Sequence, residues 1–282
     1  MKKRGFYAPL SARVLVSLTF FLTGAVWAGD PSDTARFLGG NSCPHCDLRY
    51  ENASRNVAKG VDLRGAYMFN INLYSAKLIG ANLESANLHT ANLERADLSR
   101  TKLDRAILSS ASLVGATLIG SSLQQLTARD ANFDAADLSN ADLATADLNS
   151  ASFIFAFAES ANFMSADLRL TNFSKARISG AQFVNANLAG ANFSDARLPS
   201  ADMRRALMAR INLSRANLAY SNLSGAVLTD ANLQKADLTG VNLSNANLQN
   251  ADLTGAEMGS TLLEGANTCG AKLPPGLLAT PC

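Results

Sequence analysis

Residues 61–100 read VDLRG AYMFN INLYS AKLIG ANLES ANLHT ANLER ADLSR when they are divided into blocks of five. The third position of each block, here called the centre, keeps its phase from Leu63 to Leu263, and 39 of these 41 centres are Leu, Phe, Met or Ile. Only Ala128 and Ala158 differ. The residue two before the centre is Ala in 31 blocks, and the residue one before it is Asn or Asp in 24. This regularity indicates one repetitive architecture rather than an ordinary globular core.

A period of five fits neither an α-helix nor a long strand. It fits a short extended piece that turns a corner in every block, because the centre and the residue two before it then share one side while the Asn or Asp points outward. The last two residues of the block must form the turn. Ten glycines fall on the second of these, where a positive φ is free of penalty: Gly65, Gly80, Gly115, Gly120, Gly180, Gly190, Gly225, Gly240, Gly255 and Gly265.

Blocks such as ANLES at residues 81–85 and ADLTG at residues 251–255 resemble the A(D/N)LxX repeat of the pentapeptide-repeat proteins. The resemblance covers roughly residues 46–267. It implies an all-β fold, a right-handed quadrilateral parallel β-helix of about ten coils with the centres stacked inside. Residues 20 apart would then lie over one another, which predicts a ladder of amide hydrogen bonds. Its members are Asn72, Asn92, Asn132, Asn172, Asn192, Asn212 and Asn232.

Residues 1–28 have the features of a cleaved signal peptide. Four basic residues and no acidic one accompany an apolar run at residues 14–26, and Val26-Trp27-Ala28 predicts cleavage after Ala28. The alternative is an uncleaved anchor, but the run is short of the ~20 residues that span a bilayer. Cleavage changes the formal net charge from +2 to −2. We therefore expect a periplasmic or extracellular protein with no membrane insertion and no affinity for nucleic acid.

The two ends of the repeat carry the four cysteines. We expect an irregular segment at residues 29–45, the repeat at residues 46–267 and a C-terminal cap at residues 268–282. Exported chains favour disulfides, and the economical arrangement pairs Cys43 with Cys46 and Cys269 with Cys282, although the spacing leaves the connectivity open.

Cys43-Pro44-His45-Cys46 has a second interpretation. The same tetrapeptide occurs in strongly oxidising thiol oxidoreductases, where the His activates the first Cys. That chemistry needs a thioredoxin frame, which the pattern does not show. The stretch from Cys43 to Leu48 also resembles the CxxCDL start of many pentapeptide-repeat proteins, which favours a cap over a redox site.

The sequence contains no recognisable catalytic site. The two histidines, His45 and His89, form no metal-ligand spacing, and no nucleophile elbow or phosphate loop is present. Carboxylates that lie close together are expected from the repeat itself, so they carry no catalytic signal. We expect no enzymatic activity, no metal and no cofactor.

The outward positions vary between residues 130 and 215. Seven acidic residues and no basic ones occupy residues 130–167, and eight basic residues against two acidic ones occupy residues 169–215. In this region Ser152–Ala158 reads SFIFAFA, and either Phe157 points outward or the Ala centre has let it turn inward. If exposed, these residues predict a partner or dimer surface. Its candidates are Ile154, Phe155, Phe157, Met164, Val184, Arg177, Arg197, Arg204 and Arg205.

These features predict an exported scaffold or binding protein with an unidentified protein partner, and a homodimer stays open. The family resemblance offers another function, since some members mimic duplex DNA and bind DNA gyrase, which protects against quinolones. That function needs a cytosolic, strongly acidic rod, and only the acidic stretch at residues 130–167 favours it. A periplasmic thiol oxidoreductase built on Cys43 and Cys46 is a third alternative.

Overall fold

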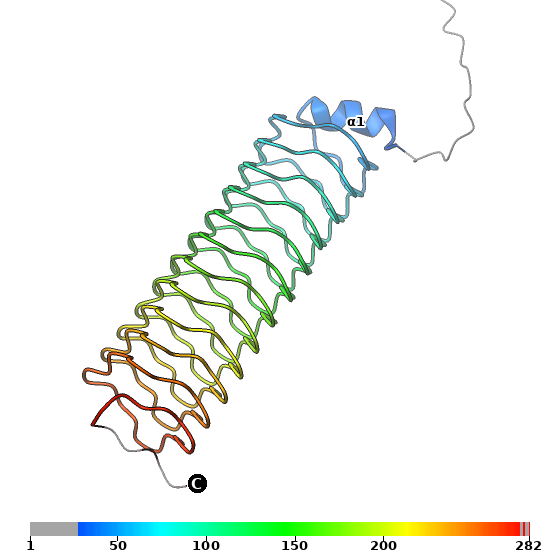
Figure 1. Ribbon diagram of the computed structural model, residues 1–282. Helices are drawn as coiled ribbons and strands as arrows, with labels where there is room; N and C mark the ends of the chain where they lie inside the picture. Colours follow the sequence, from blue (N-terminus) through cyan, green and yellow to red (C-terminus); the bar gives the residue numbers. More distant parts are fainter. Residues whose placement is uncertain (1–27, 277–278, 280–281) are drawn as a thin grey trace, which may run out of the picture.

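The computed structural model describes residues 28–276, 279 and 282, which form an elongated rod of stacked coils (Figure 1). Every fifth residue from Asp47 to Asp252 pairs in parallel with the residue 20 positions further along. These pairings are single bridges, so the described residues contain no longer strand. A turn follows each bridge, which gives four turns per coil of 20 residues. The predicted parallel solenoid is confirmed in its period and register.

The centres and the residues two before them fill the inside of the rod, as the pattern predicts. The rings of Phe133, Phe153, Phe173 and Phe193 lie in one column, with centroids 4.5–4.7 Å apart. Phe163 and Phe183 stack at 4.9 Å in a second column, whose rings meet the first column edge to face. Offset-stacked and edge-to-face aromatic contacts add to the free energy gained from burial.

The two small centres do not break the phase. In the block of Ala128, the large side chain has moved two positions back, since Leu126 is fully buried beside it. Ala158 is also fully buried, in the coil that holds Phe153 and Phe163. Phe157 keeps the bridges to Asp137 and Arg177 that every residue before a centre makes, so it faces outward.

The turns explain two features of the sequence. The second turn residue adopts a left-handed φ whether it is Gly or not, as at Gly65 (62°) and Phe155 (59°). The Asn or Asp before the centre closes the same turn, because its side-chain oxygen accepts a hydrogen bond from the backbone N–H two residues later. Asn82 accepts in this way from Glu84 at 3.1 Å. This Asx turn gives a reason for the Asn and Asp preference that outward orientation alone does not.

The asparagine ladder is continuous over its C-terminal half. The side-chain amide of Asn192 donates to Asn172, that of Asn212 to Asn192 and that of Asn232 to Asn212, with N–O distances of 3.1–3.2 Å. Asn72 donates to Asn52 at 3.2 Å. The column is interrupted where Ser112 and Ser152 take the place of Asn.

The N-terminal cap contains a helix that the sequence analysis missed. Helix α1, Pro31–Leu38, lies across the first coil (Figure 1). Asp30 caps it by accepting from the N–H groups of Ser32 and Asp33, and Pro31 follows the cap directly. Phe37 is buried in the core cluster, and the Asn56 amide donates to its carbonyl. The segment at residues 29–45 is therefore a folded lid on the first coil, not an irregular stretch.

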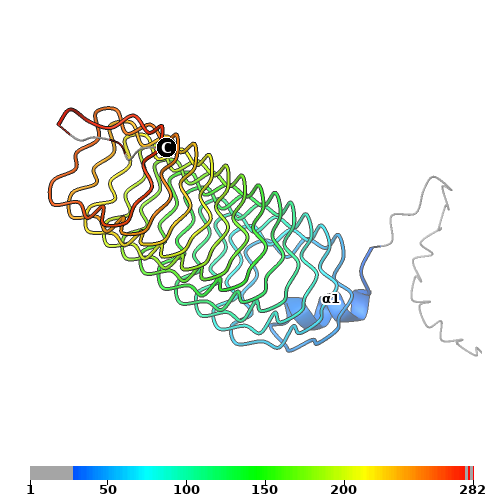
Figure 2. The same cartoon turned by 90° about the horizontal axis from the view of Figure 1, so that it is seen from below.

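The opposite end of the rod is less completely covered. Figure 2 shows the last coil at this end of the rod. Met258, Leu263 and Leu273 are only partly buried there, and a disulfide joins Cys269 to Cys282. Of the expected signal peptide, only Ala28 lies among the described residues. Within residues 28–276, 279 and 282, no helix has the length and apolar character needed to cross a bilayer.

Candidate binding surface

One side of the rod carries exposed aromatic rings next to exposed cations. Phe155 and Phe157 are 55% and 37% exposed. In the next coil, the Lys175 ammonium lies 5.3 Å from the ring centroid of Phe155, and the Arg177 guanidinium lies 5.5 Å from that of Phe157. Arg197 follows Arg177 on the same column of bridges. We call these five residues the aromatic–cationic surface, in which two partly exposed rings lie beside cationic groups.

The nine residues expected to form one surface are divided between two sides of the rod. Ile154 is half-buried next to the aromatic–cationic surface. The other four candidates lie on turns half a coil away, at the opposite corner: Met164, Val184, Arg204 and Arg205. Val184, Arg204, Arg205 and Ser224 line an open hollow of about 290 Å³ there. Because ten residues separate the two sets around the coil, no single flat partner contacts both.

The acidic stretch at residues 130–167 is neutralised in part by arginine side chains. Asp147 pairs with Arg129 and Glu159 with Arg177 across neighbouring coils, while Asp167 pairs with Arg169 within one coil. Arg215 makes a bidentate pair with Asp195, with N–O distances of 2.6 and 2.7 Å. The rod therefore does not present the uninterrupted acidic surface that mimicry of duplex DNA requires.

Arginine also fixes the ionisation of several carboxylates. Hydrogen bonds from Arg64, Arg169 and Arg204 lower the pKa values of Asp62, Asp167 and Asp202 respectively, against a smaller opposing effect of burial. An ordinary Asp has a pKa near ~3.9 in the unfolded chain. The stabilisation from a lowered pKa is therefore complete above about pH 4 and is lost as the pH falls further.

We expect the urea midpoint of unfolding to stay level between about pH 7 and pH 5 and to fall below about pH 4. Urea titrations followed by circular dichroism at stepwise pH values measure this. The Arg169→Gln variant should show a slightly shallower acid decline, because its Asp167 loses the interaction that lowers its pKa. A midpoint that rises on acidification would contradict this expectation.

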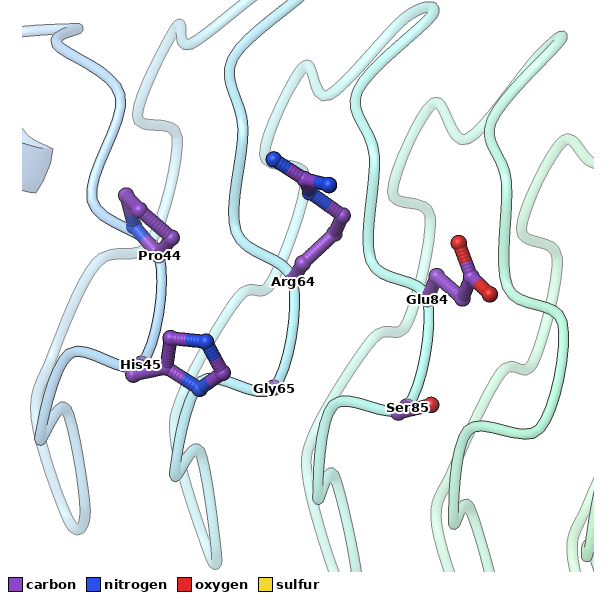
Figure 3. A pocket seen from close by; sticks show the side chains of 6 residues that line it. All are labelled: Pro44, His45, Arg64, Gly65, Glu84 and Ser85. Carbon is purple, nitrogen blue, oxygen red and sulfur yellow. The ribbon is translucent and has the colours of Figure 1, made fainter.

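A shallow hollow of about 420 Å³ lies at the N-terminal end of the rod, lined by Pro44, His45, Arg64, Gly65, Glu84 and Ser85 (Figure 3). The His45 ring lies against Gly65, where a Cβ atom would come within 2.5 Å of its Nδ1. Arg64 is held by Asp62 through a bidentate pair. Among the described residues no nucleophile or carboxylate hydrogen-bonds to the His45 ring, so the hollow offers no general-base arrangement.

All four cysteines are in disulfides, paired within each end of the chain as expected. Cys43 and Cys46 are buried beneath α1, and the Cys43 sulfur lies 3.9 Å from a carboxylate oxygen of Asp33. Burial blocks attack by an external thiol, and the carboxylate disfavours a Cys43 thiolate. Asp33 and the two sulfurs are also close enough to hold a metal ion, but the disulfide leaves no thiolate to act as ligand.

Comparison with known proteins agrees with this architecture. The sequence profile described as Pentapeptide repeats matches in eight copies, at residues 59–95, 71–109, 86–125, 129–164, 166–205, 206–245 and 231–267 among them. No curated protein matches the sequence.

Two cyanobacterial structures and one resistance protein are among the similar solved structures. HetL, a pentapeptide repeat protein involved in heterocyst differentiation regulation in Nostoc, is 28% identical over 87% of this chain and 97% of its own, with a TM-score of 0.53. Rfr23 from Cyanothece is 37% identical over 34% of this chain and 63% of its own, with a TM-score of 0.27. QnrB1, a plasmid-mediated fluoroquinolone resistance protein, is 23% identical over 55% and 88%, with a TM-score of 0.30.

The repeat profile spans most of the chain, and the register of 20 residues per coil is the one the repeat demands. The protein belongs to the pentapeptide-repeat family.

Proposed function

We propose that this chain is an exported, non-enzymatic binding rod of the periplasm or cell envelope, built as a right-handed quadrilateral solenoid of about ten coils. Its aromatic–cationic surface is the site that contacts a protein partner. The observation that carries the proposal is that Phe155 and Phe157 are both exposed and that a cation of the next coil lies over each ring.

The chemistry of the surface defines the kind of partner. Lys175, Arg177 and Arg197 present three cations, and only Arg177 has an acidic partner within the described residues, Glu159. An acidic protein surface with an apolar centre would complement both the charges and the rings. Aromatic residues and Arg are also the side chains that most often dominate binding energy at interfaces.

Export is supported by the leader at residues 1–28 and by the use of every cysteine in a disulfide. The intact mass of the protein from an envelope fraction, with and without thiol alkylation, tests it. We expect a mass that lacks residues 1–28 and no alkylated thiol. A full-length mass with four free thiols would overturn the proposal and return attention to a cytosolic gyrase partner.

Site-specific photo-crosslinking in intact cells tests the surface itself. A benzophenone amino acid at position 155 should yield a discrete crosslinked adduct. The double substitution Lys175→Glu with Arg177→Glu should lower the yield of this adduct by about tenfold or more. Position 170 is the matched control, because Leu170 is also exposed and has the same φ of 59° at a turn of another side. Equal adducts at positions 155 and 170, or none at either, would contradict the proposed surface.

A further inference from the structure

The side of the rod that carries Phe157 has an ordered sequence of charges along its axis. Parallel bridges stack five consecutive outward residues there, one per coil: Arg177, Arg197, Asn217, Asp237 and Glu257. We call this set the 217 column. Two cations lie on one side of the uncharged Asn217 and two carboxylates lie on the other. Rotation by 180° about Asn217 therefore places each cation where a carboxylate was.

The charged side chains of the 217 column make few ion pairs among the described residues. Among the described residues, Arg197 and Glu257 make no ion pair, and Asp237 only closes its own turn by accepting from the Thr239 N–H at 3.0 Å. Arg177 contacts Glu159 at 3.4 Å with a single nitrogen. By contrast, Arg169 and Arg204 on other sides make bidentate pairs with the Asp two residues before them.

We propose that two copies of this chain pack side to side through this column, with their rod axes antiparallel and a two-fold axis passing beside Asn217. Arg197 then faces the partner's Asp237, and Arg177 faces the partner's Glu257. The inference goes beyond the proposed function: it uses Arg177 and Arg197 of the aromatic–cationic surface, whereas Phe155 and Phe157 lie outside the five paired coils and stay available to another partner.

The neighbouring turn supports the same register. With this two-fold axis each turn faces its own counterpart, so Asp195 lies opposite the partner's Lys235. Arg215 meets its own counterpart near the axis, but Asp195 already neutralises it through a bidentate pair. The other outward residues along these turns are mostly small; they include Ser174, Ser194, Ser214, Ser179, Gly180 and Gly240. The exception is Tyr220, which is 71% exposed with its ring beside Gly240 and which the same rotation places opposite its own counterpart near the axis.

Other ways of packing the same two sides either place like charges opposite each other or form fewer ion pairs between the copies. Parallel rods would place Arg177 and Arg197 opposite their own counterparts, which repel each other. An antiparallel pair shifted by one coil, with Arg177 opposite the partner's Asp237, leaves Arg197 opposite an uncharged Asn217. Only the register centred on Asn217 matches both cations of the column to carboxylates.

The pairing should be weak and sensitive to salt. Five coils at a strand spacing of ~4.8 Å extend over only about 20 Å. The buried area is therefore below the ~1,200 Å² of a standard stable interface. Exposed charge pairs are screened within about 10 Å at 0.1 M salt. We expect half-dimerisation at tens of micromolar protein in about 20 mM salt, and monomer at about 300 mM.

Sedimentation velocity of the mature protein, with charge reversals, tests the register. Arg197→Glu and Asp237→Arg should each raise the dimer dissociation constant about tenfold or more, because each single variant faces two like-charge contacts. An equimolar mixture of the two variants should restore dimers, since the carboxylate introduced at position 197 then faces the guanidinium introduced at position 237, and the two unchanged residues also pair. Arg210→Glu is the matched control, an exposed turn arginine on another side, and should leave dimerisation unchanged.

Restoration in the mixture but in neither variant alone supports the antiparallel register, because only pairing between copies produces it. A protein that stays monomeric up to about 300 µM in low salt overturns the inference, as does a dimer that both reversals leave intact. A monomer that still gives the position-155 adduct in cells would refute self-pairing and keep the proposed binding surface. Circular dichroism of each variant separates loss of pairing from loss of fold.

Discussion

Replacing Phe173 with Ala is expected to lower the free energy of unfolding by about 3–5 kcal/mol. Phe173 is fully buried, and its ring stacks on Phe153 and Phe193 at 4.5 and 4.7 Å. It also meets the rings of Phe163 and Phe183 edge to face. Truncation therefore removes an inner ring of the first column, together with its edge contacts to the second, and leaves a cavity that neighbours held by backbone pairing cannot collapse to fill.

Urea denaturation followed by circular dichroism measures the effect, and Phe155→Ala is the matched control. Phe155 is the same residue type one coil away, but it is 55% exposed and its ring lies beside the Lys175 ammonium at the surface. Its truncation should change the free energy of unfolding by no more than about 0.5 kcal/mol. Similar losses in the two variants would show that the aromatic columns do not carry the stability of the middle coils.

Removing the C-terminal disulfide should have the second largest effect. The Cys269–Cys282 bond closes a loop with a sequence separation of 13. By restricting the unfolded chain, a loop of this length raises the free energy of unfolding by about 3 kcal/mol. Met258, Leu263 and Leu273 in the last coil are only partly buried, so little apolar packing compensates for the loss. In a solenoid each coil contacts only its neighbours, and the loss should appear as fraying from this end.

Hydrogen exchange read by mass spectrometry locates that fraying. In Cys269→Ser with Cys282→Ser, amides of residues 250–273 should exchange markedly faster, while those of residues 160–200 keep their wild-type rates. Cys282→Ser alone should behave like the double variant, which excludes an effect of the freed thiol. Uniform acceleration along the whole rod would contradict fraying from one end, and unchanged exchange would show that the disulfide contributes no stability.

The sequence alone determined the interior of this protein. Backbone hydrogen bonds join residues three positions apart across each turn and residues 19 or 21 positions apart between coils. The same local contacts are therefore repeated along the whole rod. That is why the inward centres, the left-handed turns and the asparagine ladder follow from residues 61–265. The Asp30-Pro31 pair, an N-cap followed by Pro at the first helical turn, was a readable signal for α1 that the repeat obscured.

The tertiary structure decided what the period does not encode. Phe157 faces outward because its backbone keeps the bridges to Asp137 and Arg177 beside the small Ala158 centre, a choice between two orientations that the sequence pattern left open. Ion pairs such as Arg129–Asp147, Arg177–Glu159 and Arg215–Asp195 form because side chains 18 to 20 positions apart meet across coils. The expected partner surface divides into two because residues ten positions apart lie at opposite corners of a coil of 20 residues, which the sequence order alone does not show.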